Sequence, residues 1–282
     1  MTEQSDLVKV ERRGAVCEVV IDRADARNAV NLELCHALHE VFSSFEMGED
    51  TRAVLLRSVG PVFCAGADLK AVSAGDEEKM RRIREDQDGP MGPTRMSLSK
   101  PVIAAVSGYC VAGGLELAAW CDLRVADESA AFGVFCRRFG VPLIDGGTVR
   151  LPRLIGMSHA LDLILTGRPV QAEEAAHMGL ANRVVSTGQA LDVACQLAEQ
   201  LAAFPQQCMR GDRQSAYQQW GLNEHDALSN EARHGRATLA SGETDREALS
   251  PFGLWAHAGR GEATNPIPMA SAPAAQHLEA RV

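Results

Sequence analysis

The sequence predicts an α/β fold with a helical C-terminal portion. Short runs rich in Val, Ile and Leu alternate with amphipathic helical patterns in the first half of the chain, and helical patterns fill the second half. A chain of 282 residues can bury about 75% of the surface that it exposes when unfolded. Because aromatic residues make up only 5% of the chain, small aliphatic side chains must form most of the core.

Strand and helix signals alternate in the N-terminal quarter of the chain. Ala15–Ile21 is rich in Val and close to alternating, which predicts a strand. Apolar residues at spacings of three and four predict a helix over Asn31–Phe45, whose first residue is suited to the N-cap. Ala53–Leu56 is a short strand candidate, and the Gly60-Pro61 break separates it from Val62–Ala65.

The middle of the chain alternates between polar and apolar segments. Ala71–Lys100 is the most polar stretch and predicts a helix or a mobile lid. Pro101–Val106 and Leu123–Ala126 are apolar strand candidates. Between them, Gly113-Gly114 opens an apolar helix over Leu115–Trp120.

The second half reads as mostly helical. A helix is expected from a cap at Ser158 to a stop at Gly167. Residues 263–282 are low in complexity and contain three prolines, which predicts a disordered tail. Further helical segments are expected at 172–179, 190–204 and 223–240.

Charge and cysteine usage exclude several classes of protein. Lys and Arg total 28 against 37 Asp and Glu, and a net charge of −9 argues against nucleic-acid binding, which needs clustered cations. The eight cysteines form no C-x-x-C pair and several lie in apolar runs, which predicts reduced, buried thiols. No secretory signal and no membrane-spanning run is recognised, so we expect a cytoplasmic protein that does not enter a membrane.

Common nucleotide-binding and hydrolase motifs are absent from the sequence. There is no G-x-G-x-x-G after a strand, no P-loop, no G-x-S-x-G and no H-E-x-x-H. Cys35, His36 and His39 could share a helix face as metal ligands, but a solvated helix face is the interpretation that we favour. No metal site is therefore expected.

Two glycine-containing segments carry the candidate chemistry. In Phe63–Leu69, small residues after a strand leave backbone N–H groups open to a ligand. In Gly108–Leu117, a strand runs directly into a helix, whose N-terminus favours an anion, and Glu116 lies one turn into that helix. Backbone donors beside a carboxylate suit enolate chemistry. Either glycine pair could instead be a packing contact, and Glu116 a capping carboxylate.

These segments resemble the crotonase family, also called the enoyl-CoA hydratase/isomerase family. The likeness runs from about Val8 to Gly261 and is densest in PVIAAVSGYCVAGGLELAAWCDLRVA, with FCAGADL, LPRLIG and LTGRPVQAEEAAHMGLANRVV also fitting. It implies a spiral of β-β-α units with a helical C-terminal region, an acyl-CoA substrate, and a homotrimer or dimer of trimers. The implied organisation is a spiral core at 1–200, a helical trimerisation region at 201–262 and the tail at 263–282.

The resemblance assigns candidate roles by position. The oxyanion donors would be the N–H groups of Ala67 and Gly113, and Glu116 matches the first catalytic glutamate of the family. The loop around Ala26 and Arg27 resembles the one that holds the adenine end of CoA, although Arg27 could equally be an exposed loop residue. The other substrate contacts implied by the motifs are Ala65, Gly66, Asp68, Leu69 and Gly114.

One departure from the family pattern concerns the second catalytic glutamate. Counting without gaps, Cys136 stands where hydratases of the family have that residue. We interpret Cys136 as a pocket-wall thiol rather than a nucleophile. Asp145 resembles the aspartate of the dienoyl-CoA isomerase branch and is the candidate second catalytic group; the alternative is a turn residue before Gly146-Gly147.

Three functions remain open at this point. Hydration of a 2-enoyl-CoA is the first choice, because Glu116 is kept. A double-bond isomerase is the nearest rival, since moving one proton needs fewer carboxylates. A protein that binds acyl-CoA with weak or no turnover is the third, because the second glutamate is missing. No metal or redox cofactor is expected, and coenzyme A enters as part of the substrate.

Overall fold

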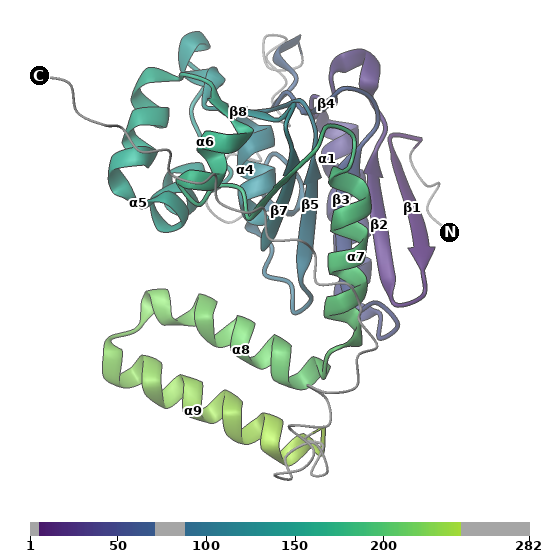
Figure 1. Cartoon of the computed structure of the whole chain (residues 1–282), viewed down its shortest axis with the longest axis vertical. Helices are drawn as coiled ribbons and strands as arrows, with labels where there is room; N and C mark the ends of the chain where they lie inside the picture. Colours follow the sequence, from purple (N-terminus) through teal and green to yellow (C-terminus); the bar gives the residue numbers. More distant parts are fainter. Residues whose placement is uncertain (1–5, 71–87, 244–282) are drawn as a thin grey trace, which may run out of the picture.

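A computed structural model of the protein describes residues 6–70 and 88–243. Most of the predicted lid (71–87), the end of the predicted trimerisation region (244–262) and the predicted tail (263–282) lie outside these ranges. Two β-sheets form the centre of the described chain, and helices pack against them, while the first strand lies at an open outer edge (Figure 1).

The larger sheet has six strands in the order β1-β2-β3-β5-β7-β10. β1 runs antiparallel to β2, and the other neighbours are parallel. The strands predicted from apolar runs are present as β2, β3, β5 and β7, within two residues of the expected bounds. The six strands are Val8–Arg13, Val16–Ile21, Ala53–Ser58, Val102–Val106, Leu123–Asp127 and Arg183–Val185.

The smaller sheet has four strands in the order β4-β6-β8-β9, and the chain alternates between the two sheets. β3 leads to β4, β5 to β6 and β7 to β8, so each turn of the spiral adds one strand to each sheet. Gly108 forms one of these turns at φ +62, and a Cβ there would lie 1.9 Å from the Pro61 carbonyl oxygen. The four strands are Val62–Cys64, Tyr109–Val111, Ala131–Gly133 and Val170–Gln171.

Helices cover both faces of the larger sheet. α7 (Ala190–Ala203) packs on one face, where Leu55 and Ile103 belong to its apolar cluster. α1 (Leu32–Met47) packs on the opposite face. The predicted N-cap Asn31 is confirmed, since its side chain accepts a hydrogen bond from Leu34 N at 3.0 Å.

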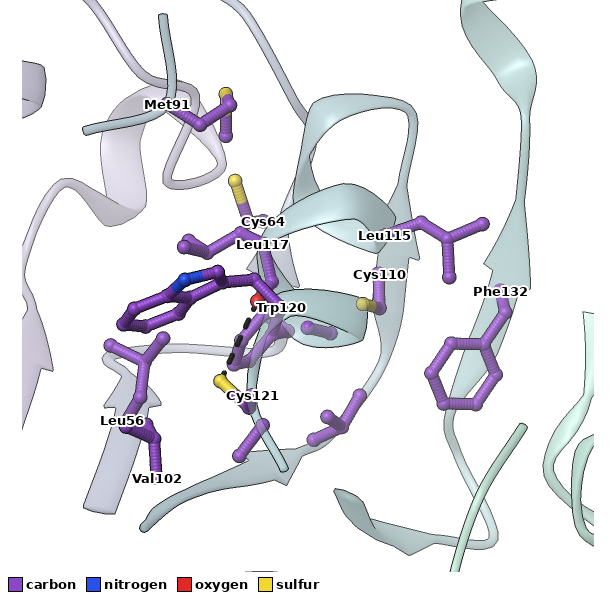
Figure 2. Packing of buried hydrophobic residues seen from close by; sticks show 14 of the residues in the cluster. Leu56, Cys64, Met91, Val102, Cys110, Leu115, Leu117, Trp120, Cys121 and Phe132 are labelled. Carbon is purple, nitrogen blue, oxygen red and sulfur yellow. Dashed lines mark hydrogen bonds between the residues drawn. The ribbon is translucent and has the colours of Figure 1, made fainter. Parts of the chain in front are cut away.

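α4 (Gly113–Trp120) is buried along its whole length between the two sheets. In Figure 2, Leu115 lies on the side of Phe132, and Trp120 lies on the side of Leu56. The indole N–H of Trp120 donates to the Met96 carbonyl oxygen at 3.0 Å. The helix therefore has a fixed position, with its first turn at the end of β6.

A buried arginine closes the C-terminal end of α4. Arg124 is 1% exposed. Its Nη1 donates to the carbonyl oxygens of Ala118 (3.3 Å) and Cys121 (2.7 Å), and its Nε donates to that of Leu180 (2.6 Å). The guanidinium group thus satisfies carbonyls that a helix end leaves open.

α5 (Gly147–Thr166) begins well before the predicted start at Ser158. Gly156 adopts non-helical angles inside it, so the helix is kinked there, and Pro152 lies in its first half. These two residues are helix breakers in a sequence pattern, which explains why only the second half was predicted. α6 (Ala172–His177) follows β9.

α8 (Gln206–Gln218) and α9 (Glu224–Ser241) lie side by side, apart from the two sheets (Figure 1). Asp122 in the core accepts hydrogen bonds from Arg213 Nε and Tyr217 Oη, each at 2.8 Å. α8 is therefore attached to the core largely by polar contacts. The predicted boundary at 200/201 falls inside α7 and stays a prediction.

The remaining short elements of the described residues are four 3₁₀ turns, and they link the main elements. In the ranges 6–70 and 88–243, no helix has both the length and the apolar character needed to cross a bilayer. All eight cysteines are free thiols, and all but Cys195 and Cys208 are buried. The turns are η1 (Ala24–Ala26), η2 (Pro93–Arg95), η3 (Phe135–Phe139) and η4 (Gln219–Gly221).

Candidate active site

The two glycine-containing segments singled out in the sequence meet at the N-terminus of α4. Gly114 lies against β4, because a Cβ on it would be 2.3 Å from the carbonyl oxygen of Cys64. Gly66, at φ +92, lies against the start of the helix, because a Cβ there would be 2.9 Å from Gly113 N. Only glycine allows both close approaches without moving the main chain.

Among the described residues, the backbone N–H groups of Ala67 and Gly113 have no hydrogen-bond acceptor at this contact. Ala67 pairs with Val30 in a parallel bridge. In this bridge Val30 N donates to Gly66 O at 2.8 Å, and Asp68 N donates to Val30 O at 2.9 Å. The N–H of Ala67 therefore faces away from Val30. Gly113 is the first residue of α4, so its N–H has no partner within the helix. No hydrogen bond between described residues uses either group.

Glu116 lies in the first turn of α4 and is 2% exposed. Its Oε1 accepts hydrogen bonds from the N–H groups of Asp145 (2.9 Å) and Gly147 (2.8 Å). Burial, and after it the charge of Asp145, raises the pKa of Glu116 to about 7, although these two hydrogen bonds oppose the shift. The carboxyl group can therefore gain and lose a proton near neutral pH.

Asp145 is the second buried carboxyl group of the site, at 3% exposure. Its Oδ1 accepts hydrogen bonds from Met91 N (2.9 Å) and Thr94 Oγ1 (2.5 Å). Burial raises the pKa of Asp145, and these two hydrogen bonds act in the opposite direction. Met91 also packs on the helix start, since a Cβ on Gly113 would lie 2.7 Å from Met91 Sδ. Asp145 thus lies beside both Glu116 and the segment that covers Gly113.

Cys136 lies in η3 and is 7% exposed. Burial, followed by the charge of Glu116, raises the pKa of its thiol. The group is therefore protonated at neutral pH, which agrees with a pocket wall and not with a nucleophile.

The predicted CoA loop lies against the first segment. The carbonyl oxygen of Arg27 accepts a hydrogen bond from Ala65 N at 3.1 Å, and Ala26 lies in η1 just before it. Arg27 and Asn28 both have φ +54, and the buried Asn28 amide donates to two carbonyl oxygens of the β3–β4 turn. The loop backbone is thus fixed beside Ala65, while the Arg27 side chain is exposed.

Two of the predicted substrate contacts have other surroundings. The carboxylate of Asp68 forms an ion pair with Arg23 at 2.8 Å, so it holds the loop that contains Arg27. Leu69 follows it and is 45% exposed. The structure therefore gathers Ala65, Gly66, Ala67, Gly113, Gly114, Glu116, Asp145 and Cys136 at one place, whereas the side chain of Asp68 is already engaged.

Three residues of this site were missed in the sequence. Met91 and Thr94 hold Asp145. Arg150 donates through Nη1 to the Asp145 carbonyl oxygen (2.8 Å) and through Nη2 to that of Thr94 (2.6 Å). The one local signal was the Gly146-Gly147 pair, which indicated a turn.

The histidine and cysteine group on α1 does not form a metal site in the structure. Cys35 Sγ donates to the Gly89 carbonyl oxygen at 3.6 Å, and His39 Nε2 lies 3.5 Å from Asp88 Oδ2. Across the described parts of the chain, no three His, Cys, Asp or Glu side chains are placed to hold a metal ion.

Comparison with known sequences gives consistent matches. The family profile described as enoyl-CoA hydratase/isomerase matches residues 11–252. A Mycobacterium tuberculosis protein named enoyl-CoA hydratase EchA19 is 40% identical over 204 residues, which are 69% of this chain and 74% of that protein. The carnitinyl-CoA dehydratase of Proteus mirabilis is 36% identical over 204 residues, which are 70% of this chain and 75% of that protein.

Solved structures extend the similarity to the fold. The crystal structure of enoyl-CoA hydratase EchA1 from Mycobacterium marinum superimposes with a TM-score of 0.79 at 30% sequence identity. The superposition covers 90% of this chain and 97% of that chain, so the likeness extends over most of both chains and is not confined to a shared motif.

Proposed function

Because the chain belongs to the enoyl-CoA hydratase/isomerase (crotonase) family, whose enzymes act on acyl-CoA, we propose that it adds water to a 2-enoyl-CoA to give a 3-hydroxyacyl-CoA. The family and the α/β fold expected from the sequence are confirmed. One observation carries the proposal: the buried carboxyl group of Glu116 lies in the helical turn that begins with the N–H of Gly113, and the N–H of Ala67 lies beside it. Neither N–H has an acceptor in the described part of the chain.

The two N–H groups are the proposed oxyanion donors. The thioester carbonyl oxygen of the substrate would accept a hydrogen bond from Ala67 N and another from Gly113 N. Negative charge develops on this oxygen when water adds to the β-carbon, so donors placed there stabilise the transition state. One such donor is worth about 3 kcal/mol, or roughly 10²–10³ in rate.

Glu116 is the proposed proton carrier. Its carboxylate removes a proton from water while the water oxygen bonds to the β-carbon, and the electrons of the double bond move toward the thioester oxygen. The protonated carboxyl group then delivers that proton to the α-carbon, so the net change is the addition of one water molecule. A pKa of about 7 suits both steps, and proton transfer of this kind contributes about 10²–10⁴ in rate.

Asp145 is the proposed second polar group around the water. Its Oδ1 is occupied by Met91 N and Thr94 Oγ1, and Oδ2 is the oxygen that we propose to contact the substrate side. Cys136 would form part of the wall around the reacting carbons. On the CoA side, we propose contacts from Ala26, Arg27, Ala65, Gly66, Leu69 and Gly114.

Double-bond isomerisation is a second candidate, and Cys136 favours it. A buried thiol with a raised pKa does not replace a glutamate as a base. Moving the double bond of a 3-enoyl-CoA needs only one carrier, since Glu116 can remove a proton from the α-carbon and return it to the γ-carbon. The enolate intermediate would use the same two N–H donors.

A spectrophotometric assay separates the two reactions. Hydration of crotonyl-CoA removes the absorbance of the conjugated thioester, whereas isomerisation of a 3-enoyl-CoA increases it. Glu116→Gln should lower kcat by about 10²–10⁴ without unfolding the protein. Glu128→Gln, an exposed carboxylate on the surface, is the matched control and should keep the wild-type rate.

Other outcomes of this assay would contradict the proposal. No signal with any chain length, together with tight acyl-CoA binding by calorimetry, would identify an acyl-CoA-binding protein. Equal rates for the wild type and Glu116→Gln would show that the carboxyl group has been assigned wrongly.

We also propose that the protein assembles as a homotrimer or a dimer of trimers. The support is a set of exposed apolar side chains on the α8–α9 hairpin, where an isolated subunit would leave them in water. Light scattering of the full chain would give the mass directly, and a monomer at micromolar concentration would contradict the proposal. These side chains are Tyr217, Trp220, Leu222, Leu228 and Leu239.

A further inference from the structure

The guanidinium group of Arg150 joins the two segments that surround Asp145. Nη1 donates to the carbonyl oxygen of Asp145 at 2.8 Å, and Nη2 donates to that of Thr94 at 2.6 Å. These two residues are 51 positions apart in the sequence. Because the guanidinium is planar and rigid, it holds its two acceptors at a fixed spacing. Arg150 lies in the first turn of α5, so a helix anchors this contact.

Each of the two segments leads to a group in the proposed site. The Asp145 segment supplies the N–H groups of Asp145 and Gly147 that hold Glu116 Oε1. In the other segment, the Thr94 hydroxyl holds Asp145 Oδ1. No hydrogen bond among the described residues links Arg150 to either carboxylate, so it can hold them in place only through the backbone of the two segments.

The turn before α5 is shaped to admit this guanidinium. Gly146 has φ +95, and a Cβ on it would lie 2.0 Å from Arg150 Nη1 and 2.9 Å from its Cζ. Any other residue would therefore strain the backbone and displace the guanidinium group. The glycine and the arginine form one unit, in which the turn leaves space that the side chain fills.

We propose that Arg150 is a positioning residue, which fixes Glu116 and Asp145 by holding the carbonyl oxygens of Asp145 and Thr94 together. This inference rests on the proposed function, because the placement of the carboxyl groups matters for rate only if they handle protons. The substrate is not expected to touch Arg150.

The charge of Arg150 provides a second readout. The positive charge favours the ionised forms of Glu116 and Asp145 and so lowers the pKa of both. The charged or titratable groups that act on Glu116 include Asp145 and Arg150, and Cys136 lies beside it. Tyr217 of α8 and Cys121 act on Arg150 in turn, and Arg95 acts on Asp145. Loss of this charge should therefore raise the pKa of Glu116.

The test compares three variants of the full chain in the enoyl-CoA assay. Arg150→Gln should lower kcat by about 10²-fold with little change in KM, and should move the acidic limb of the pH–rate profile to higher pH. Arg150→Lys keeps the positive charge but lacks the planar guanidinium group. Its kcat should therefore fall, while the acidic limb of the pH–rate profile stays near its wild-type position. Arg153→Gln is the matched control and should behave as wild type. Arg153 is an exposed arginine of the same helix, and its Cζ lies 4.8 Å from the centre of the Trp220 ring.

A fourth variant covers the case in which Arg150→Gln fails to fold. Gly146→Ala keeps the arginine and its charge but displaces the guanidinium group, so kcat should fall with no change of net charge. If a folded Arg150→Gln or Gly146→Ala protein has the wild-type kcat and the wild-type pH–rate profile, the positioning role of Arg150 is wrong. The proposed function would not be affected by that result. A wild-type protein inactive toward both 2-enoyl-CoA and 3-enoyl-CoA would instead overturn the proposed function, and this inference with it.

Discussion

The two ends of α4 are both buried but differ in how their backbone groups are satisfied. At the C-terminal end, Arg124 donates to the carbonyl oxygens of Ala118 and Cys121. At the N-terminal end, the N–H of Gly113 has no partner among the described residues. Glu116 does not cap its own helix either, because its Oε1 accepts from Asp145 N, just before α5, and from Gly147 N, at the first residue of α5.

This difference indicates a division of roles along one short helix. A closed end lowers the free energy of the folded state, since buried carbonyl groups without donors cost about 1–3 kcal/mol each. An open end keeps donors and a partial positive charge for a ligand that carries negative charge. The C-terminal end of α4 therefore serves stability, and we propose that the N-terminal end serves the thioester oxygen.

The largest expected effect is at the closed end. Arg124→Met should lower the free energy of unfolding by about 3 kcal/mol, because three buried carbonyl groups lose their donor while the cost of burying a charge is removed. The protein that remains folded should keep its kcat. Denaturant unfolding monitored by circular dichroism measures the change.

Arg124→Lys is the matched variant for this experiment. It keeps the charge and can reach fewer carbonyl oxygens, so its stability should lie between the wild type and Arg124→Met. A loss of kcat larger than the loss of folded protein would show that the two ends of α4 are not independent.

The next effect concerns the open end and depends on pH. The pKa of Glu116 rises from 4.5 to about 7 on folding, so between these values the folded state binds more protons than the unfolded state. The free energy of unfolding should therefore fall as pH rises from about 4.5 to 7, by up to about 3 kcal/mol, and level off above that. Denaturant unfolding at several pH values gives the free energy of unfolding of the wild type and of Glu116→Gln. The difference between the two proteins should be smallest at the acidic end of the range. Parallel curves for the two proteins would contradict the raised pKa.

The smallest effect tests the contact between the open end and β4. In Gly114→Ala, the added Cβ would meet the Cys64 carbonyl oxygen at 2.3 Å, which should cost about 1–3 kcal/mol of stability and displace Gly113 N. We expect a lower kcat in the enoyl-CoA assay as well. Gly235→Ala in α9 is the matched control, since its Cβ would meet no atom within 4 Å and should stabilise the helix by up to about 1 kcal/mol. Wild-type stability and kcat in Gly114→Ala would mean that this contact does not fix the helix start.

The fold was predictable where apolar pattern decides structure. β2, β3, β5 and β7 are apolar runs, and each was found within two residues. β1 was missed, because it is an edge strand whose VKVERR sequence is mostly exposed and charged. α8 was missed for a similar reason, since it is polar along most of its length and contacts the core through Arg213 and Tyr217.

The sequence alone determined the local parts of the site: small residues at Gly66 and Gly113, and Glu116 one turn into a helix. These depend on short-range geometry, such as the freedom of glycine and the open N–H groups of a helix end. Only the tertiary structure decided that Met91 and Thr94 hold Asp145. It also decided that burial, and after it the charge of Asp145, raises the pKa of Glu116, and that Arg150 joins the segments of Asp145 and Thr94. Hydrogen bonds between segments about fifty residues apart leave no periodic pattern along the chain, because they depend on how the whole spiral packs.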